Sequence, residues 1–132
     1  MLLAEKVCLI TGGGSGIGEA TAKLFASEGA FVIITDVDEK AANGVVSEIG
    51  PKAKFINCDV TQEKQVHDTI KKIVEIYDRL DCAVNNAGIT GTPSNIEHTT
   101  LENLSNVIAV NLTGVFLCLK HEINQMITQG SG

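Results

Sequence analysis

A glycine-rich run, Thr11-Gly12-Gly13-Gly14-Ser15-Gly16-Ile17-Gly18, most limits what this chain can fold into. A short apolar segment from Val7 to Ile10 precedes the run, and a helical pattern from Glu19 to Ser27 follows it. Glycines permit a tight turn and the close approach of an anion, and the helix that begins there offers unpaired N–H groups. This order of strand, turn and helix predicts a binding site for the diphosphate of a nucleotide.

The spacing within the run differs from the common dinucleotide fingerprint, G-x-G-x-x-G, because no register places glycine at all three positions. A flexible glycine turn without a ligand is therefore an alternative interpretation. The apolar segment before the run and the helical pattern after it favour the nucleotide site. The pattern that does occur is T-G-x-x-x-G-x-G, on Thr11, Gly12, Gly16 and Gly18.

Strand-like and helix-like segments alternate along the chain, which predicts the α/β fold class. The β-α-β-α-β-α-β order implies a Rossmann-like, doubly wound parallel sheet with right-handed crossovers, truncated after the fourth strand and the following helix. Short, continuous apolar runs predict strands at Lys6–Thr11, Phe31–Asp36, Ala53–Asn57 and Asp81–Asn85. Helical patterns span Gly16–Ser27, Glu39–Ile49, Gln62–Tyr77 and Leu101–Gln129, the last after a capping box, Thr99-x-x-Glu102.

Asp36 ends the second predicted strand, downstream of the glycine run. A carboxylate at this place can accept hydrogen bonds from both ribose hydroxyls of an adenosine, and it would repel a 2′-phosphate. No Lys or Arg stands at Gly13, Gly14 or Val37 to pair with such a phosphate, so the pattern favours NAD over NADP. The alternative is that Asp36 caps the helix that begins near Asp38.

Two further segments follow predicted strand ends and could face the same ligand. Asp59-Val60 could accept from the adenine amino group and pack on its ring, or Asp59 could cap the next helix. Asn85-Asn86-Ala87-Gly88 closes the fourth strand. Small residues there would admit a ligand while the amides tie neighbouring strands, and a plain turn is the alternative.

Asn111 is an amide within an otherwise apolar helical pattern, between Val110 and Leu112. A buried amide needs hydrogen-bond partners. Asn111 could hold a water at a site, or it could simply cap an internal carbonyl.

These segments, in this order and at this spacing along the whole chain, resemble the NAD-preferring subgroup of the short-chain dehydrogenase/reductase family. The resemblance implies an NAD-dependent oxidoreductase that transfers a hydride between nicotinamide and a secondary alcohol or ketone. It implies that Asn111 kinks its helix and anchors a water of the proton relay, as a catalytic residue. It also implies a homo-oligomer, a dimer or tetramer at full length, with the last helix at the interface. The implied cofactor-binding residues are Gly12, Ser15, Gly16, Ile17, Gly18, Asp36, Asp59, Val60, Asn86, Ala87 and Gly88.

The family's catalytic serine and Tyr-x-x-x-Lys have no counterpart in these 132 residues. The single tyrosine, Tyr77, is followed four residues later by Asp81, and its place on an apolar stripe predicts a core position. We therefore expect residues 1–132 to be an incomplete NAD-binding domain, a fragment of a longer enzyme and inactive alone. The alternatives are a non-catalytic, half-length nucleotide-binding module and the relic of a broken gene.

Composition narrows the partners further. The net charge of −6 and the scattered basic residues argue against nucleic acid, and we expect no segment as long as a membrane span. The start of the chain does not have the form of a signal peptide. Cysteines 8, 58, 82 and 118 and the three histidines lack metal-ligand spacing, so we expect no metal, reduced structural thiols and a cytoplasmic protein.

Overall fold

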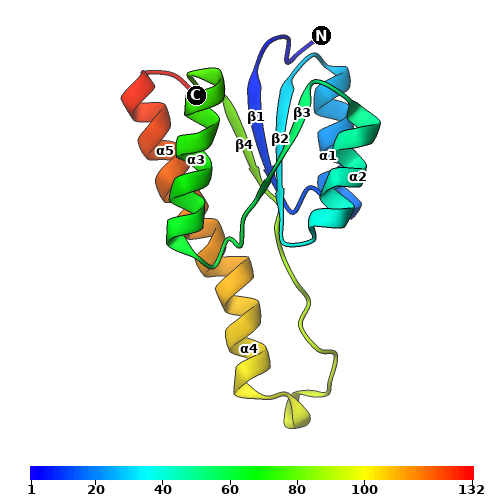
Figure 1. The fold of residues 1–132 in the computed structure, drawn as a ribbon. Helices are drawn as coiled ribbons and strands as arrows, with labels where there is room; N and C mark the ends of the chain where they lie inside the picture. Colours follow the sequence, from blue (N-terminus) through cyan, green and yellow to red (C-terminus); the bar gives the residue numbers. More distant parts are fainter.

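The computed structural model describes residues 1–132 as a four-stranded parallel sheet with helices on both faces (Figure 1). The strand order β3-β2-β1-β4 is that of a doubly wound sheet, which confirms the predicted α/β class. Each predicted strand and helix is present, with shifts of one residue at the starts of β1, α3 and β4. The elements are β1 Val7–Thr11, α1 Gly16–Ser27, β2 Phe31–Asp36, α2 Glu39–Ile49, β3 Ala53–Asn57, α3 Glu63–Tyr77, β4 Cys82–Asn85, the 3-10 turn η1 Ile96–His98, α4 Leu101–Ile108, the π-helical η2 Ala109–Gly114 and α5 Val115–Gln129.

β1 lies in the interior of the sheet, between β2 and β4, and all five of its residues are buried. Leu9 is in register with Ile33 on β2 and with Ala83 on β4. Because helices cover both faces of the sheet, the side chains on either side of β1 are buried. The strand is therefore a continuous apolar run rather than an alternation of apolar and polar residues.

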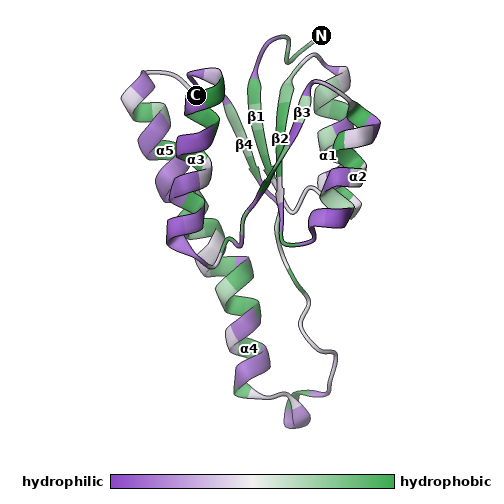
Figure 2. Ribbon diagram, in the orientation of Figure 1, coloured by the Kyte–Doolittle hydropathy of each residue, from purple (hydrophilic) through white to green (hydrophobic).

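Alternate residues of β1 enter two different hydrophobic cores. Cys8 and Ile10 pack in the layer beneath α1 and α2, with Ala22 and Val45. Val7 and Leu9 belong to the cluster on the opposite face, which includes Ile70 and Ile73 of α3 and the half-buried Tyr77. Figure 1 shows α1 and α2 on one face and α3 and α5 on the other, and Figure 2 shows the apolar strands between them.

The capping box predicted at Thr99 is wrong by one residue. Thr100 is the N-cap of α4, and its hydroxyl accepts a hydrogen bond from the backbone N of Asn103 at 3.1 Å. Thr99 instead ends η1, where its hydroxyl donates to the carbonyl of Asn95 at 3.1 Å. A short 3-10 turn places Thr99 outside the helix, and no sequence pattern predicted that turn.

Residues 101–129 form one continuous helix whose middle, η2, is π-helical rather than α-helical. A π segment inside an α-helix widens one turn, and such segments are frequent at functional sites. Gly114 of η2 packs so closely on Val60 that an added Cβ would lie 2.6 Å from its Cγ2 atom. The α4 end of this helix projects beyond the sheet, beside the long loop that follows β4 (Figure 1).

One face of this long helix is apolar and exposed (Figure 2). The expectation that no segment is as long as a membrane span is wrong by length and composition, because Leu101–Gln129 is long and apolar enough to cross a membrane. The core helix of a soluble protein can meet the same criterion, and the opposite face of this helix buries Leu117, Cys118 and Glu122. We call the exposed face the α4–α5 stripe, formed by Leu104, Ile108, Leu112, Phe116, Leu119 and Ile123.

Candidate functional site

A cleft of about 430 Å³ opens at the edge of the sheet where the parallel strands end. The carboxyl ends of such strands are where ligands bind in open α/β sheets. Every predicted cofactor-binding residue except Gly18 lines this cleft. The predicted residues in its lining are Gly12, Ser15, Gly16, Ile17, Asp36, Asp59, Val60, Asn86, Ala87 and Gly88.

Hydrogen bonds tie the glycine turn to the residues that follow β4. The hydroxyl of Thr11 accepts from the backbone N of Asn86 and of Ala87, each at 3.0 Å. The Asn86 side-chain amide donates to the carbonyls of Thr11 and Gly12, each at 3.1 Å. The Asn86 side chain therefore holds the turn in place, and the neighbouring backbone faces the cleft.

Backbone conformation explains the glycines on the cleft side of the turn. Gly12 and Gly16 have φ angles of +65° and +55°, a region that other residues rarely adopt. A Cβ on Gly12 would lie 2.9 Å from Cα of Ala87, whereas a Cβ on Gly16 would meet nothing within 4 Å. Gly12 thus allows two strand ends to meet, and Gly16 leaves the backbone open toward the cleft.

Gly18 lies outside the cleft lining, but it supports the turn from behind. It is buried in α1, and an added Cβ would overlap the carbonyl of Gly12 and lie 2.6 Å from Nδ2 of Asn86. Its role in this structure is therefore close packing of α1 against the turn, rather than direct exposure to a ligand.

The N-terminus of α1 faces the cleft with its first N–H groups uncapped by a side chain. Ser15 is the N-cap, and its hydroxyl makes no capping hydrogen bond. Ser15, Gly16 and Ile17 line the cleft. Uncapped N–H groups and the positive end of a helix dipole together form a site that suits an anion.

Asp36 places its carboxylate across the turn from α1. Its Oδ2 accepts from the backbone N of Gly14 at 2.9 Å, and its Oδ1 accepts from the backbone N of Asp38 at 3.0 Å. The interpretation of Asp36 as the α2 cap is wrong, because Asp38 is the N-cap and accepts from Ala41 at 3.0 Å. Each Asp36 oxygen keeps further lone pairs for a ligand.

Asp59 lies in the turn before α3 and also lines the cleft. Its Oδ1 accepts from the backbone N and the hydroxyl of Thr61, at 2.9 and 2.8 Å, which shapes the turn before α3. The N-cap of α3 is Gln62, so Asp59 does not cap the helix itself. Its Oδ2 makes no hydrogen bond, and both Asp59 and the buried Val60 line the cleft.

Asn111 lies in η2 and uses its side chain outside the helix. Its Oδ1 accepts from the backbone N of Ile89, and its Nδ2 donates to the carbonyl of Ile89, both at 2.8 Å. The expectation of a buried amide is wrong, because Asn111 is exposed, and the carbonyl that its side chain binds belongs to a loop residue. The amide instead fastens the loop after β4, and it lies beside Val110, which lines the cleft.

Sequence reasoning missed four residues of the cleft lining: Val37, Cys58, Ile89 and Val110. Each is the chain neighbour of a predicted residue, so adjacency to Asp36, Asp59, Gly88 or Asn111 was the available signal. The lining contains the carboxylates of Asp36 and Asp59 and no basic side chain.

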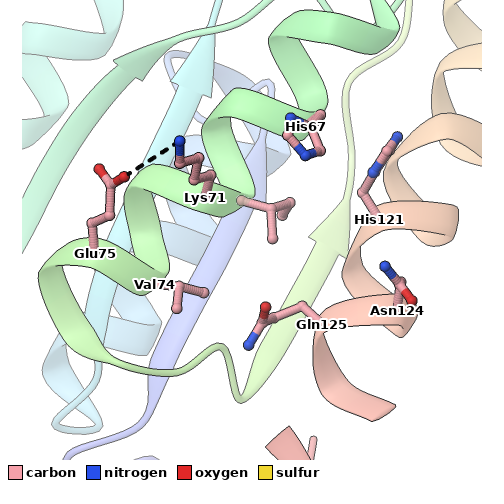
Figure 3. Close-up of a pocket in the computed structure, with 8 residues that line it drawn as sticks. His67, Lys71, Val74, Glu75, His121, Asn124 and Gln125 are labelled. Carbon is pink, nitrogen blue, oxygen red and sulfur yellow. Dashed lines mark ion pairs between the residues drawn. The ribbon is translucent and has the colours of Figure 1, made fainter. Parts of the chain in front are cut away.

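A second hollow of about 320 Å³ lies between α3 and α5 (Figure 3). His67 and His121 face each other across it with ring centroids 5.5 Å apart, and Lys71 pairs with Glu75 at 3.9 Å. No group of three metal-ligating side chains occurs in the structure. The hollow shares no lining residue with the cleft. Its histidines contact carboxylates outside its lining, His67 on Asp68 and His121 on Glu63.

The sheet order and the cleft define a Rossmann-type nucleotide-binding domain. The model of the short chain dehydrogenase family matches residues 6–132, so the chain belongs to this family of oxidoreductases. The crystal structure of 3-ketoacyl-(acyl-carrier-protein) reductase from Brucella melitensis, complexed with NADH, superposes with a TM-score of 0.92. The sequences are 38% identical, and the alignment covers 97% of this chain and 53% of that one.

Two plant enzymes are also similar in sequence. Borneol dehydrogenase, mitochondrial, from Lavandula x intermedia is 44% identical over 131 residues, which cover 98% of this chain and 50% of that protein. Secoisolariciresinol dehydrogenase from Forsythia intermedia is 45% identical over 133 residues, 98% of this chain and 48% of that protein. The chain therefore spans about half the length of these relatives.

Proposed function

We propose that the cleft binds NAD and that this chain is the cofactor-binding part of an oxidoreductase acting on a secondary alcohol or ketone. The observation that carries this proposal is the Asp36 carboxylate, which ends β2 beside the glycine turn in a cleft without basic side chains. A carboxylate there suits the ribose hydroxyls of NAD and repels the 2′-phosphate of NADP. The NADH in the crystal structure of the Brucella melitensis relative supports a nicotinamide cofactor.

The residues of the cleft suit successive parts of this cofactor. The glycine turn and the uncapped N-terminus of α1 would hold the diphosphate, because both present backbone N–H groups without bulky side chains. Asp36 would bind the adenosine ribose, and Asp59 with Val60 would face the adenine. Residues 86–88 would lie toward the nicotinamide. When bound, the nicotinamide ring supplies or accepts the hydride.

Tyr77 cannot serve as the family's catalytic tyrosine. Its ring packs on Phe31 with centroids 5.4 Å apart, and Phe31 begins β2 at the edge opposite the cleft. We propose that the catalytic serine and Tyr-x-x-x-Lys lie outside these 132 residues, and that this chain alone binds the cofactor without turning over substrate. Asn111, which fastens the loop beside the cleft, would then complete the proton relay.

The proposed enzyme is a cytoplasmic homo-oligomer. The exposed α4–α5 stripe supports the assembly, because soluble proteins rarely leave an apolar row of this length uncovered. The four cysteines form no disulfide, in keeping with a reducing compartment. Burial raises the pKa of Cys8 and of Cys118 to about 12, so both thiols stay protonated at neutral pH.

The test is a fluorescence titration of the chain with NADH and with NADPH. We expect the chain to bind NADH more tightly, and we expect Asp36→Ala to weaken NADH binding by roughly 10- to 100-fold, since a hydrogen bond to a charged group contributes about 1.5–3 kcal/mol. The same change should reduce the difference in affinity between NADH and NADPH, because it removes the charge that repels the 2′-phosphate.

Asp38→Ser is the matched control, because Asp38 lies two residues away, caps α2 and does not line the cleft. Serine is also a good N-cap, so this variant should bind NADH like the unmodified chain. Equal affinity for NADH and NADPH in the unmodified chain would contradict the choice of NAD. Failure to bind either cofactor would contradict the proposed site.

A further inference from the structure

Glu122 is a buried carboxyl group that the proposed function does not use. It lies on α5 with 1% of its surface exposed, and its Oε2 accepts a hydrogen bond from Nδ2 of Asn85 on β4 at 2.8 Å. Its Oε1 is buried without a partner, and so is Oδ1 of the same Asn85. One contact between two side chains thus leaves two unpaired acceptors, which is costly in a protein interior.

No cation compensates a negative charge on Glu122. Its neighbours along the helix, Lys120 and His121, both contact Glu63 of α3, at 2.6 and 3.1 Å. Neither α3 nor β4 brings a charged group to it, and the titratable group beside it is Cys118, which is neutral. Burial raises the pKa of Glu122, although the hydrogen bond from Asn85 opposes the shift.

We propose that Glu122 is a neutral carboxylic acid at physiological pH, that it forms a cyclic two-bond pair with Asn85, and that it is a positioning residue for the cleft. In this pair Oε1 carries the proton and donates it to Oδ1 of Asn85, while Oε2 accepts from Nδ2. A single proton then satisfies both unpaired acceptors. A carboxylate could not do so, because an ionised carboxyl group has no hydrogen to donate.

The pair acts where β4 enters the cleft. Asn85 directly precedes Asn86, whose side chain holds the carbonyls of Thr11 and Gly12. In the proposed pair, two hydrogen bonds between Asn85 and Glu122 of α5 fix the strand end that fastens the glycine turn. This consequence for cofactor binding rests on the proposed function, whereas the protonation of Glu122 does not.

The first test is infrared spectroscopy of the chain at pH 7. The unmodified chain should show the carbonyl band of a protonated carboxylic acid, shifted in deuterated water and missing from Glu122→Gln. Glu63→Gln is the matched control, because hydrogen bonds from Lys120 and His121 lower the pKa of that exposed carboxyl group, so its loss should leave the band unchanged. A spectrum that contains carboxylate bands alone would overturn the proposal.

The second test is the urea unfolding midpoint as a function of pH. A glutamine at position 122 can donate to Oδ1 of Asn85 and accept from Nδ2, so Glu122→Gln reproduces the pair without a titrating proton. Because the pKa of Glu122 is raised in the folded state, the unmodified chain loses stability as the pH rises above the unfolded value of about 4.3. The urea midpoint of Glu122→Gln, relative to that of the unmodified chain, should therefore rise with pH. A difference between the two midpoints that does not change with pH would overturn the proposal.

The third measurement separates this inference from the proposed function. Glu122→Gln should bind NADH like the unmodified chain, and Glu122→Ala should bind it more weakly. NADH affinity equal in all three chains would overturn the positioning role. If no chain binds NADH, the proposed function fails while the infrared band still tests the protonation of Glu122. If Glu122→Ala does not fold, the pH dependence of Glu122→Gln and the infrared band still test whether Glu122 is protonated.

Discussion

Replacing Gly18 by alanine should remove measurable NADH binding, even though Gly18 does not line the cleft. The added Cβ would overlap the carbonyl of Gly12 and lie 2.6 Å from Nδ2 of Asn86. Both contacts are with the parts of the chain that hold the glycine turn, so α1 or the turn must shift. Backbone at a diphosphate site has little tolerance for such a shift, because its N–H groups bind the ligand directly.

The same change should destabilise the fold by about 1–3 kcal/mol, the usual cost of overpacking a filled interior. Fluorescence titration with NADH and urea unfolding measure the two effects. The matched control is Gly44→Ala, since Gly44 lies within α2 and an added Cβ there meets nothing within 4 Å. That control should bind NADH normally and gain about 0.5–1 kcal/mol, because alanine favours a helix over glycine. Normal NADH affinity in Gly18→Ala would contradict the packing role.

Replacing Asp81 by alanine should lower the free energy of unfolding by about 2–4 kcal/mol, because it removes a buried carboxylate together with its hydrogen bond and its ion pairs. The Asp81 carboxylate is buried directly before β4 and accepts from the backbone N of Val7 at 2.8 Å. Lys6 lies 3.6 Å from it, and Arg79 also pairs with it. The alanine variant would leave the Val7 amide unpaired between β1 and β4. Urea unfolding at pH 7 measures the loss.

The stability that Asp81 contributes should depend on pH. Burial by itself would raise the pKa of Asp81, but the Val7 amide, Arg79 and Lys6 outweigh it and hold the pKa below its usual value. A lowered folded-state pKa means that the contribution is complete above the unfolded value of about 3.9 and is lost as the pH falls through the folded one. Asp81→Ala should lack this acid-dependent loss.

Asp68→Ala is the control for Asp81, because the Asp68–Lys64 pair lies on the surface of α3. Exposed pairs contribute about 0–1 kcal/mol, so this variant should unfold nearly as the unmodified chain does. If both variants lost the same free energy of unfolding, Asp81 would contribute no more to stability than a surface charge does.

The strands and helices could be predicted because their signals are local. Each strand is a short apolar run, and α1 to α3 each have an amphipathic pattern or a glycine boundary within their own residues. The errors lie where the signal is not local. The turn η1 moved the α4 cap from Thr99 to Thr100. The π-helical η2 lies around Asn111, where the family resemblance implied a kink but the hydrophobic pattern alone indicated a regular helix.

The cleft could be predicted for a related reason. Parallel strands bring their carboxyl ends to one edge, so Gly12, Asp36, Asp59 and Asn86 had to lie near one another once the strand order was known. The individual contacts could not be predicted. Asn111 binds the loop backbone at Ile89, and nothing near either residue in the sequence indicates that pairing.

The sequence by itself determined the α/β class, the succession of strands and helices along the chain, and the strand ends at which polar and glycine residues gather. The tertiary structure alone decided that Gly18 packs against Gly12 and Asn86, that Asp81 pairs with an amide 74 residues away, and that Glu122 is buried against Asn85. The physical reason is the range of the forces involved. Periodicity and turn chemistry act over a few neighbouring residues, whereas burial and side-chain pairing depend on groups that meet only after the chain has folded.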